Sequence, residues 1–436
     1  MLLNYSTFLP LAEAFMPRLS QKRAAFRFKI TGRALKPAWP KYQRPMLRCQ
    51  RSPGAVARIY QKKGNMSSFY KILHTEWSNG WGGQEIRILD ECLGMAERGH
   101  EVELAGCPEG KLRKRAQESG LVFHPIAMKG PWDINALAKL VALIKAKGID
   151  IIHTHSSVDS WLGGFAARLA GIKCVRTRHL SVPVSKNPLN IVYKLPQAVT
   201  TTGVSIRRHL VEDYGLPPER VTSVPTGVDA KRFAPREPDP ELARELGLEP
   251  GRNVVAMVAV LRSWKRHDLF CAMARDLLAQ RPDTRFLIVG DGPGWKRING
   301  YLDDKGLRPA AIMTGHRNDV ERILPLCTVC VLASDKAEGV PQAVLQQFAC
   351  QKAVVAADAG DVAQVVLNEK TGLLVEPGSS DSLLAGVSRL LDDPDLRASL
   401  GRAGRELVMK KHSKKVMLDA TEKVYADLGV KKREDA

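Results

Sequence analysis

Several signatures of common protein classes are missing from this 436-residue sequence. No uninterrupted apolar run reaches the roughly 18 residues that a membrane-spanning helix needs, so we expect a soluble or peripheral protein. The phosphate-binding pattern G-x4-G-K-[S/T] and the nucleophile pattern G-x-S-x-G are both absent, which argues against a P-loop NTPase and against a serine hydrolase. No Asp-x-Asp pair stands where it would clearly hold a divalent cation, so we predict a site without a metal.

The eight cysteines show no framework spacing. Cys327 and Cys330 have the C-x-x-C spacing of a redox or zinc site, but no second pair and no nearby His pair accompany them. They fall in an apolar run, and we predict buried core thiols that a strand would place on opposite faces. This usage of cysteine fits a reducing cytoplasm, where we expect the protein to work.

Acidic residues are almost absent from the first 65 residues, which contain 14 Lys and Arg and one acidic residue, Glu13. Most of the formal net charge of +20 therefore belongs to one segment. Residues 1–65 show no clear helical or alternating period, and we predict a disordered basic extension or a mis-assigned start, with Met66 as the alternative first residue. Two other interpretations are an Arg-rich targeting peptide and an arm that binds an anionic surface.

The rest of the chain is too long for one ordinary core, which favours two domains. From Phe69 onward, short β-rich runs alternate with helical patterns, as in parallel sheets covered by helices on both faces. We predict a first domain over 66–229, with strands over 71–75, 101–105, 149–154, 173–177, 198–202 and 221–224.

A second alternating series follows a connector rich in proline and charge. It predicts a second domain over 230–410, with strands over 254–260, 285–290, 311–314, 328–333, 352–356 and 373–375. Residues 411–436 are expected to form a C-terminal helix that returns to the first domain. The predicted fold class is α/β, with two Rossmann-like domains facing each other across a cleft, where open α/β sheets bind ligands.

The most informative segment runs from Glu338 to Gln346. A predicted strand ends just before it, and Pro341 is placed to open a helix at its first turn. The free N–H groups of such a turn form a site for a diphosphate, together with the backbone of Gly339 and Val340. Glu338 could accept hydrogen bonds from sugar hydroxyls, and Gln346 could reach a ribose.

This segment resembles the Glu-x7-Glu motif of the family 4 retaining glycosyltransferases of the GT-B fold, also described as group 1. Glu338 matches the first Glu of the motif, and Gln346 replaces the second. Gly82 and Gly83 follow the first strand as the family's glycine-rich loop does. Lys265 matches the basic residue that neutralises the donor diphosphate, while the family's Arg position falls on Val260 and Arg262 is the candidate substitute.

Further segments match the same family in the same order. Gly292 lies in a Gly-Asp-Gly-Pro run that borders the family's donor site, and His316 lies where the family contacts the base. His179 resembles a His that the family keeps beside the donor sugar, whereas we interpret His153 and His155 as structural.

The resemblance implies a retaining, metal-independent transfer of a hexose-type sugar from a UDP- or GDP-sugar to a cell-envelope glycan or lipid-linked acceptor. The nucleotide sugar is a substrate, and no cofactor is expected. Glu338, Lys265 and His179 would be the catalytic residues. The donor-binding residues would be Gly82, Gly83, Arg262, Lys265, Gly292, His316, Glu338, Gly339, Val340 and Gln346.

Other functions remain open from the sequence alone. One is a nucleotide-sugar epimerase of the same fold. Another is a basic protein that binds nucleic acid or a membrane surface through residues 1–65, although no nucleic-acid motif is present and no nucleic-acid partner is expected. An anionic membrane surface is also a candidate partner of a transferase, which would then lie at the inner face of the cytoplasmic membrane.

Overall fold

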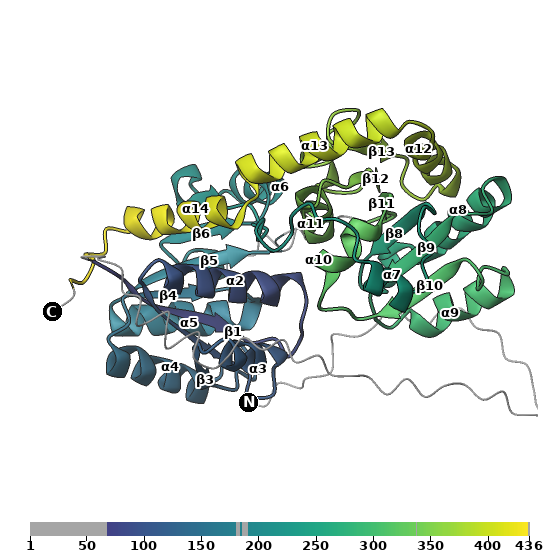
Figure 1. Ribbon diagram of the computed structural model, residues 1–436. Helices are drawn as coiled ribbons and strands as arrows, with labels where there is room; N and C mark the ends of the chain where they lie inside the picture. Colours follow the sequence, from purple (N-terminus) through teal and green to yellow (C-terminus); the bar gives the residue numbers. More distant parts are fainter. Residues whose placement is uncertain (1–67, 180–183, 185–190, 337, 435–436) are drawn as a thin grey trace, which may run out of the picture. The chain divides into compact units, whose positions relative to one another are not determined.

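A computed structural model describes residues 68–179, 184, 191–336 and 338–434 (Figure 1). The expectations for residues 1–65 and for Met66 lie outside these described residues. The described chain folds around two separate parallel sheets, as the alternating pattern predicts. No helix among the described residues is long and apolar enough to cross a membrane.

The first sheet contains seven parallel strands in the order β3-β2-β1-β4-β5-β6-β7. The chain reverses its direction of winding between β1 and β4, and such switch points are where open α/β sheets bind ligands. The strands are β1 Lys71–Glu76, β2 Glu101–Gly106, β3 Val122–Pro125, β4 Ile151–Thr154, β5 Lys173–Arg178, β6 Ala198–Thr201 and β7 Val221–Ser223. The helices between them are α2 Gly83–Glu97, α3 Lys111–Glu118, α4 Ile134–Lys147, α5 Ser157–Ala170 and α6 Val204–Arg208.

The second sheet contains six parallel strands in the order β10-β9-β8-β11-β12-β13, with its switch point between β8 and β11. The strands are β8 Val254–Val258, β9 Arg285–Val289, β10 Ala311–Gly315, β11 Val329–Leu332, β12 Ala353–Ala357 and β13 Leu373–Val375. The helices are α7 Pro240–Glu245, α8 His267–Gln280, α9 Trp295–Asp304, α10 Val320–Ile323, α11 Gln342–Ala349, α12 Ser380–Asp392 and α13 Pro394–Lys411.

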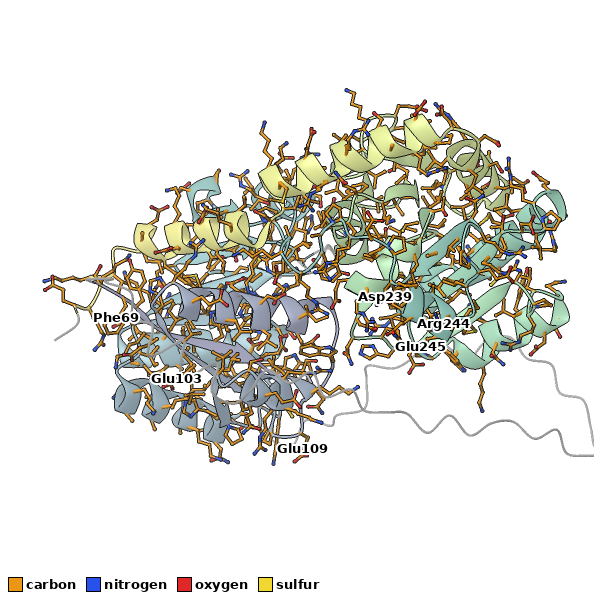
Figure 2. The ribbon with its side chains drawn as sticks, viewed as in Figure 1. Phe69, Glu103, Glu109, Asp239, Arg244 and Glu245 are labelled. Atoms are coloured by element: carbon orange, nitrogen blue, oxygen red, sulfur yellow. The ribbon has the colours of Figure 1, made fainter. Side chains whose placement is uncertain are left out.

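The last helix, α14 Lys414–Asp427, packs against α2 of the first domain (Figure 1). Met417, Leu418, Val424 and Tyr425 enter the same apolar core as β1 and α2. Gly94 makes this approach possible, because a Cβ at that position would stand 2.4 Å from Leu418. The N–H of Phe69, which Figure 2 labels, donates to the Arg433 carbonyl at 2.8 Å, so the tail after α14 also returns to the first domain.

Twelve strands agree with the sequence prediction to within a few residues, but β3 was missed. β3 is short and lies at the edge of its sheet, and Val122 is exposed there, so its residues lack the apolar run of a central strand. Edge strands with one solvated face carry weak sequence patterns. The prediction therefore found the buried strands and lost the exposed one.

The C-x-x-C pair is only partly as predicted. Cys327 and Cys330 are both buried, which confirms the interpretation as core thiols. The placement on opposite faces is wrong, because Cys327 precedes β11 and both thiols enter one apolar cluster. A hydrogen bond with Cys327 raises the pKa of the Cys330 thiol, and burial raises it further.

Candidate functional site

Lys265 and Glu338 form an ion pair at the switch point of the second sheet. Lys265 lies in the short turn after β8, and Glu338 lies in the loop after β11. Lys265 Nζ donates to Glu338 Oε1 at 2.6 Å, and the two side chains are only 19% and 12% exposed. β8 and β11 are neighbouring parallel strands, so the residues that follow them meet at one edge of the sheet.

The backbone around this pair is held by residues that the sequence analysis did not select. Arg266 has a left-handed backbone (φ 52°) and donates to Asp268 on α8 and, at 2.6 Å, to Asp335 after β11. The Asp335 N–H returns a bond to the Trp264 carbonyl at 3.1 Å. On the other side, the Asp361 N–H donates to the Glu338 carbonyl at 2.8 Å. These bonds fix both loops. The sign of them in the sequence is the charged residue Arg266, which directly follows Lys265.

Helix α11 begins beside Glu338, one residue later than predicted. Pro341 is the N-cap, with extended backbone, and the helix starts at Gln342. Proline has no side-chain oxygen to bond the first N–H groups, and no side-chain cap is present here. The first turn therefore offers backbone donors and the positive end of the helix dipole next to partly exposed Gly339 and Val340. Gln346 lies further along α11 and is partly exposed.

The Gly-Asp-Gly-Pro run holds the loop after β9 against the loop after β8. Gly292 has a φ of 155°, and a Cβ there would lie within 3.0 Å of the Leu261 backbone. The adjacent Gly294 N–H donates to the Leu261 carbonyl at 2.8 Å. Gly292 is therefore needed for the close packing of these two loops, in addition to any contact it makes with the sugar donor.

The two remaining predicted donor contacts of this domain are solvent-facing. Arg262 is exposed, and its guanidinium lies 5.1 Å above the ring of Trp264. His316 is also exposed, with Nε2 3.2 Å from Asn318 Oδ1. Neither side chain is fixed by a buried contact, so both are free to reorient toward a ligand.

In the first domain, the Glu85 carboxylate accepts hydrogen bonds from the glycine-rich loop. Gly82 is the N-cap of α2 and Gly83 begins the helix, as predicted. The Gly82 N–H donates to Glu85 Oε2 at 2.8 Å, and Ser78 Oγ donates to Glu85 Oε1 at 2.9 Å. An internal anion thus occupies the donor that a phosphate would use, and a bound phosphate would have to displace it.

His179 follows β5, is partly exposed, and is hydrogen-bonded to a chain of buried histidines. His155 Nδ1 lies 3.2 Å from His179 Nε2, and His155 Nε2 lies 2.9 Å from His74 Nδ1. His74 is on β1 and His155 directly follows β4, so both stand at the switch point of the first sheet. Burial lowers the pKa of His74 to about 3 and lowers the pKa of His155 and His179 well below the ordinary value. These rings are therefore neutral at physiological pH.

The chain continues to the C-terminal helix. Tyr425 Oη lies 3.5 Å from His74 Nε2 and 2.7 Å from His153 Nδ1, and His153 Nε2 lies 2.7 Å from Thr177 Oγ1. Glu91 Oε1 stands 3.4 Å from His153 Nδ1, and Arg87 Nε stands 3.7 Å from the other oxygen of Glu91. His153 and His155 are thus buried and hydrogen-bonded, as their structural interpretation predicted.

Three of these residues form the one cluster of the described chain whose ligand atoms are close enough for a metal ion, namely His74, His153 and His155. Metal ligands must point their ring nitrogens at one centre. Here the rings of His153 and His155 are stacked, 4.5 Å apart and tilted by 25°. His74 and His155 instead share a hydrogen bond at 2.9 Å. The arrangement serves hydrogen bonding better than coordination.

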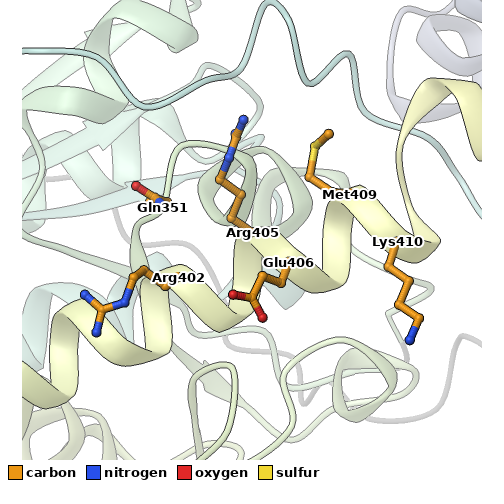
Figure 3. Close-up of a pocket in the computed structure, with 6 residues that line it drawn as sticks. All are labelled: Gln351, Arg402, Arg405, Glu406, Met409 and Lys410. Atoms are coloured by element: carbon orange, nitrogen blue, oxygen red, sulfur yellow. The ribbon is translucent and has the colours of Figure 1, made fainter.

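A surface hollow of the second domain lies along α13 (Figure 3). It is lined by Gln351, Arg402, Arg405, Glu406, Met409 and Lys410. None of the predicted site residues lines it, and Arg405 is held by a bond to the Ala349 carbonyl. The candidate site therefore rests on the strand ends and not on this hollow.

Comparison with known proteins covers both domains. Residues 81–232 match the family described as Glycosyltransferase Family 4, and residues 238–407 match Glycosyl transferases group 1. A galactosyltransferase of Escherichia coli that acts on GlcNAc-diphosphoundecaprenol is 29% identical over 69% of this chain and 81% of its own length. N-acetyl-alpha-D-glucosaminyl L-malate synthase of Bacillus anthracis is 24% identical over 77% of this chain and 91% of its own length.

Solved structures share the fold. A glycosyltransferase of Rickettsia africae superposes with a TM-score of 0.75 at 22% identity, over 82% of this chain and 98% of its own. HepE of Anabaena, solved with UDP, gives a TM-score of 0.72 at 19% identity, over 82% and 100% of the two chains. The chain belongs to the group 1 glycosyltransferases of the GT-B fold, with the two Rossmann-like domains predicted from the sequence.

Proposed function

We propose that this glycosyltransferase moves a hexose-type sugar from a UDP- or GDP-sugar to a cell-envelope glycan or lipid-linked acceptor, with retention of configuration and without a metal. The observation that carries the proposal is the ion pair between Lys265 and Glu338 beside the start of α11. It places a cation, a carboxylate and free backbone donors at one strand edge, which is the set of groups that a sugar diphosphate requires.

The mechanism follows from the charges. The leaving nucleoside diphosphate gains negative charge as the glycosidic bond to phosphate breaks, and Lys265 with the first turn of α11 would stabilise that charge. Glu338 would accept hydrogen bonds from the sugar hydroxyls and hold the ring. The acceptor hydroxyl attacks from the same face, and its proton passes to the departing phosphate oxygen. Arg262 would add a second cation once it turns from Trp264.

Relatives narrow the substrate class. The similar galactosyltransferase of Escherichia coli is named for a UDP-sugar donor and a diphosphoundecaprenol acceptor. Another relative, from Mycolicibacterium smegmatis, is named as a GDP-mannose-dependent mannosyltransferase of a phosphatidylinositol monomannoside. Both acceptors carry lipid, which supports a cytoplasmic enzyme that works at the inner face of the membrane. The remaining donor contacts would be Gly82, Gly83, Gly292, His316, Gly339, Val340 and Gln346.

The test is thermal unfolding of the full chain with a panel of nucleoside diphosphates, in the presence of a chelator. At 100 times its Kd a specific ligand stabilises the folded state by about 2.7 kcal/mol. We expect this rise with UDP or GDP, and its loss in Lys265→Ala. Lys336→Ala is the matched control, because Lys336 is an exposed lysine in the same loop as Glu338. No rise with any nucleotide, or equal loss in both variants, would contradict the proposed donor site.

A further inference from the structure

The buried histidines of the first domain belong to one uninterrupted chain of hydrogen bonds. It crosses the ends of four strands and reaches one residue of α14. Its links, in order, are Thr200–Thr177 (2.6 Å), Thr177–His153 (2.7 Å), His153–Tyr425 (2.7 Å), Tyr425–His74 (3.5 Å), His74–His155 (2.9 Å) and His155–His179 (3.2 Å).

The number of hydrogens on these side chains limits the directions that the hydrogen bonds of the chain can take. A neutral imidazole has one N–H donor and one bare nitrogen acceptor. His153, His74 and His155 each use both ring nitrogens in the chain, so each must donate on one side and accept on the other. The buried Tyr425 hydroxyl could accept from both neighbours, but its own hydrogen would then have no acceptor among the described residues, so it donates to His74 or to His153. Two arrangements of the histidines then satisfy every link, one with all donors pointing toward His179 and one with all donors pointing away. The tautomers of the four histidines are therefore coupled.

Glu91 selects between the two arrangements. Its oxygens are fully buried, and Oε1 lies 3.4 Å from His153 Nδ1. Burial raises the pKa of Glu91, and the Arg87 guanidinium, 3.7 Å away, opposes that shift as the counter-ion of the carboxylate. With Glu91 ionised as that counter-ion, the carboxylate attracts an N–H and repels a lone pair, so the hydrogen of His153 stands on Nδ1. Tyr425 then donates to His74, His74 donates to His155, and His155 donates from Nδ1 to His179 Nε2.

We propose that this chain locks His179 in the tautomer with its hydrogen on Nδ1, which makes His179 a fixed hydrogen-bond donor to an oxygen of the bound nucleotide sugar. His155, His74 and Tyr425 are positioning residues that act through His179. The hydrogen bond from His179 to the nucleotide sugar rests on the proposed function, whereas the tautomer of His179 does not. Within the described residues, which leave out 180–183 and 185–190, Nδ1 of His179 has no hydrogen-bond partner, and His179 is partly exposed.

The consequence for chemistry is that His179 cannot serve as a base. Its Nε2 lone pair is already occupied by the hydrogen from His155 Nδ1, and its free side presents an N–H. Such a donor favours an oxygen that carries or gains negative charge. The proton of the acceptor hydroxyl must then leave by another route, as in the proposed transfer to the departing phosphate.

The first experiment reads the tautomer directly, without substrate. Long-range proton–nitrogen spectra of the full chain, labelled with ¹⁵N-histidine, distinguish the two tautomers, and His179→Asn assigns the signal. We expect His179 with hydrogen on Nδ1 in the wild type. In Tyr425→Phe the ring still fills the core but the link to His74 is lost, and we expect a measurable share of the Nε2–H form. His155→Phe should produce the same change.

His124→Asn is the matched control, because His124 also bonds a neighbouring side chain, Glu103 at 2.6 Å, but lies outside the chain. It should leave the His179 tautomer unchanged. A wild-type His179 with hydrogen on Nε2 would overturn the proposal. So would an unchanged tautomer in folded Tyr425→Phe or His155→Phe protein, with folding judged from the dispersion of the same spectra.

Turnover supplies the second measurement, with the donor identified by the nucleotide panel. We expect Tyr425→Phe to lower kcat about tenfold with KM changed less than about twofold, because the lost orientation matters most in the transition state. A merely structural role would change stability and leave kcat intact, and that result would overturn the positioning role. If no nucleotide binds, the proposed function is wrong. The tautomer measurement would still show whether the hydrogen-bond chain fixes the tautomer of His179.

Discussion

Lys265 Nζ lies 2.6 Å from Oε1 of Glu338, a residue 73 positions further along the chain. Parallel strands bring the loops after β8 and β11 together, and the bonds of Arg266 hold them there. In this state the cation that should receive the diphosphate is already neutralised by the carboxylate that should hold the sugar. At the proposed donor site, binding would therefore exchange one anion for another at Lys265.

This exchange predicts opposite effects of Glu338→Gln on binding and on transfer. The variant removes the anion that competes for Lys265, so we expect a nucleoside diphosphate to bind several-fold more tightly. The sugar loses a charged acceptor for its hydroxyls, so we expect kcat to fall by about 100-fold, the scale of a lost transition-state contact. Isothermal calorimetry with UDP and GDP, and turnover with the matching nucleotide sugar, measure the two effects. Parallel weakening of both would contradict the exchange.

Gly292 offers a second prediction, on stability. Gly292→Ala places a Cβ within 3.0 Å of the Leu261 backbone at a φ of 155°, so both the contact and the backbone are strained. We expect the free energy of unfolding to fall by about 2 kcal/mol or more in a denaturant titration.

The control for this prediction is Gly300→Ala, in α9. A Cβ at Gly300 would meet no atom within 4 Å, and an alanine in a helix interior is favoured by about 0.5–1 kcal/mol over glycine. The two substitutions add the same atom, yet one should destabilise and the other stabilise. Equal changes would show that the close approach of the loops after β8 and β9 is relaxed at little cost.

A third prediction concerns the thiols. Of the cysteines in the described residues, only Cys107 is partly exposed, whereas Cys327 and Cys330 are buried. In Cys49→Ser protein we expect a thiol reagent to modify one cysteine rapidly and the other six only on unfolding. Zinc should leave this pattern unchanged. Rapid modification of two adjacent thiols, or protection by zinc, would instead revive the interpretation of C-x-x-C as a site.

The sequence predicted most of the fold because buried parallel strands are short apolar runs between turn residues. Val329–Leu332 is such a run, and each of its residues is buried. Glu338 could likewise be selected, because it follows a predicted strand and parallel strands end at a common edge, whereas Lys265 was selected through the resemblance to the family.

The remainder depends on contacts that local pattern does not encode. No periodicity indicates that Arg266 bonds Asp335, 69 residues away, or that Tyr425 reaches His153 across 272 residues. Pro341 fits the N-cap as well as the first turn, so the one-residue error in α11 was not resolvable from residue type. His153, His155 and His179 were selected from the sequence, but nothing local indicated that Tyr425 of α14 links them.

The buried histidines predict a specific pH dependence of stability. Burial lowers the pKa of His74 from the ordinary 6.5 to about 3, so between these values the unfolded chain binds a proton that the folded chain refuses. Its contribution to stability is full above pH 6.5 and is lost as the pH falls toward 3, by about 1.4 kcal/mol per pH unit. His153, His155 and His179 have pKa values lowered in the same direction.

Asp159 opposes this trend, because burial raises its pKa from 3.8 to about 7 and the folded chain therefore takes up a proton as the pH falls below 7. The comparison of wild type with His74→Gln cancels that term, since Asp159 is present in both. Between pH 6.5 and pH 4.5, the free energy of unfolding measured in urea should fall less steeply in the variant, by about 1.4 kcal/mol per pH unit. Identical slopes would mean that His74 takes up its proton in the folded protein, which the neutral hydrogen-bond chain does not permit.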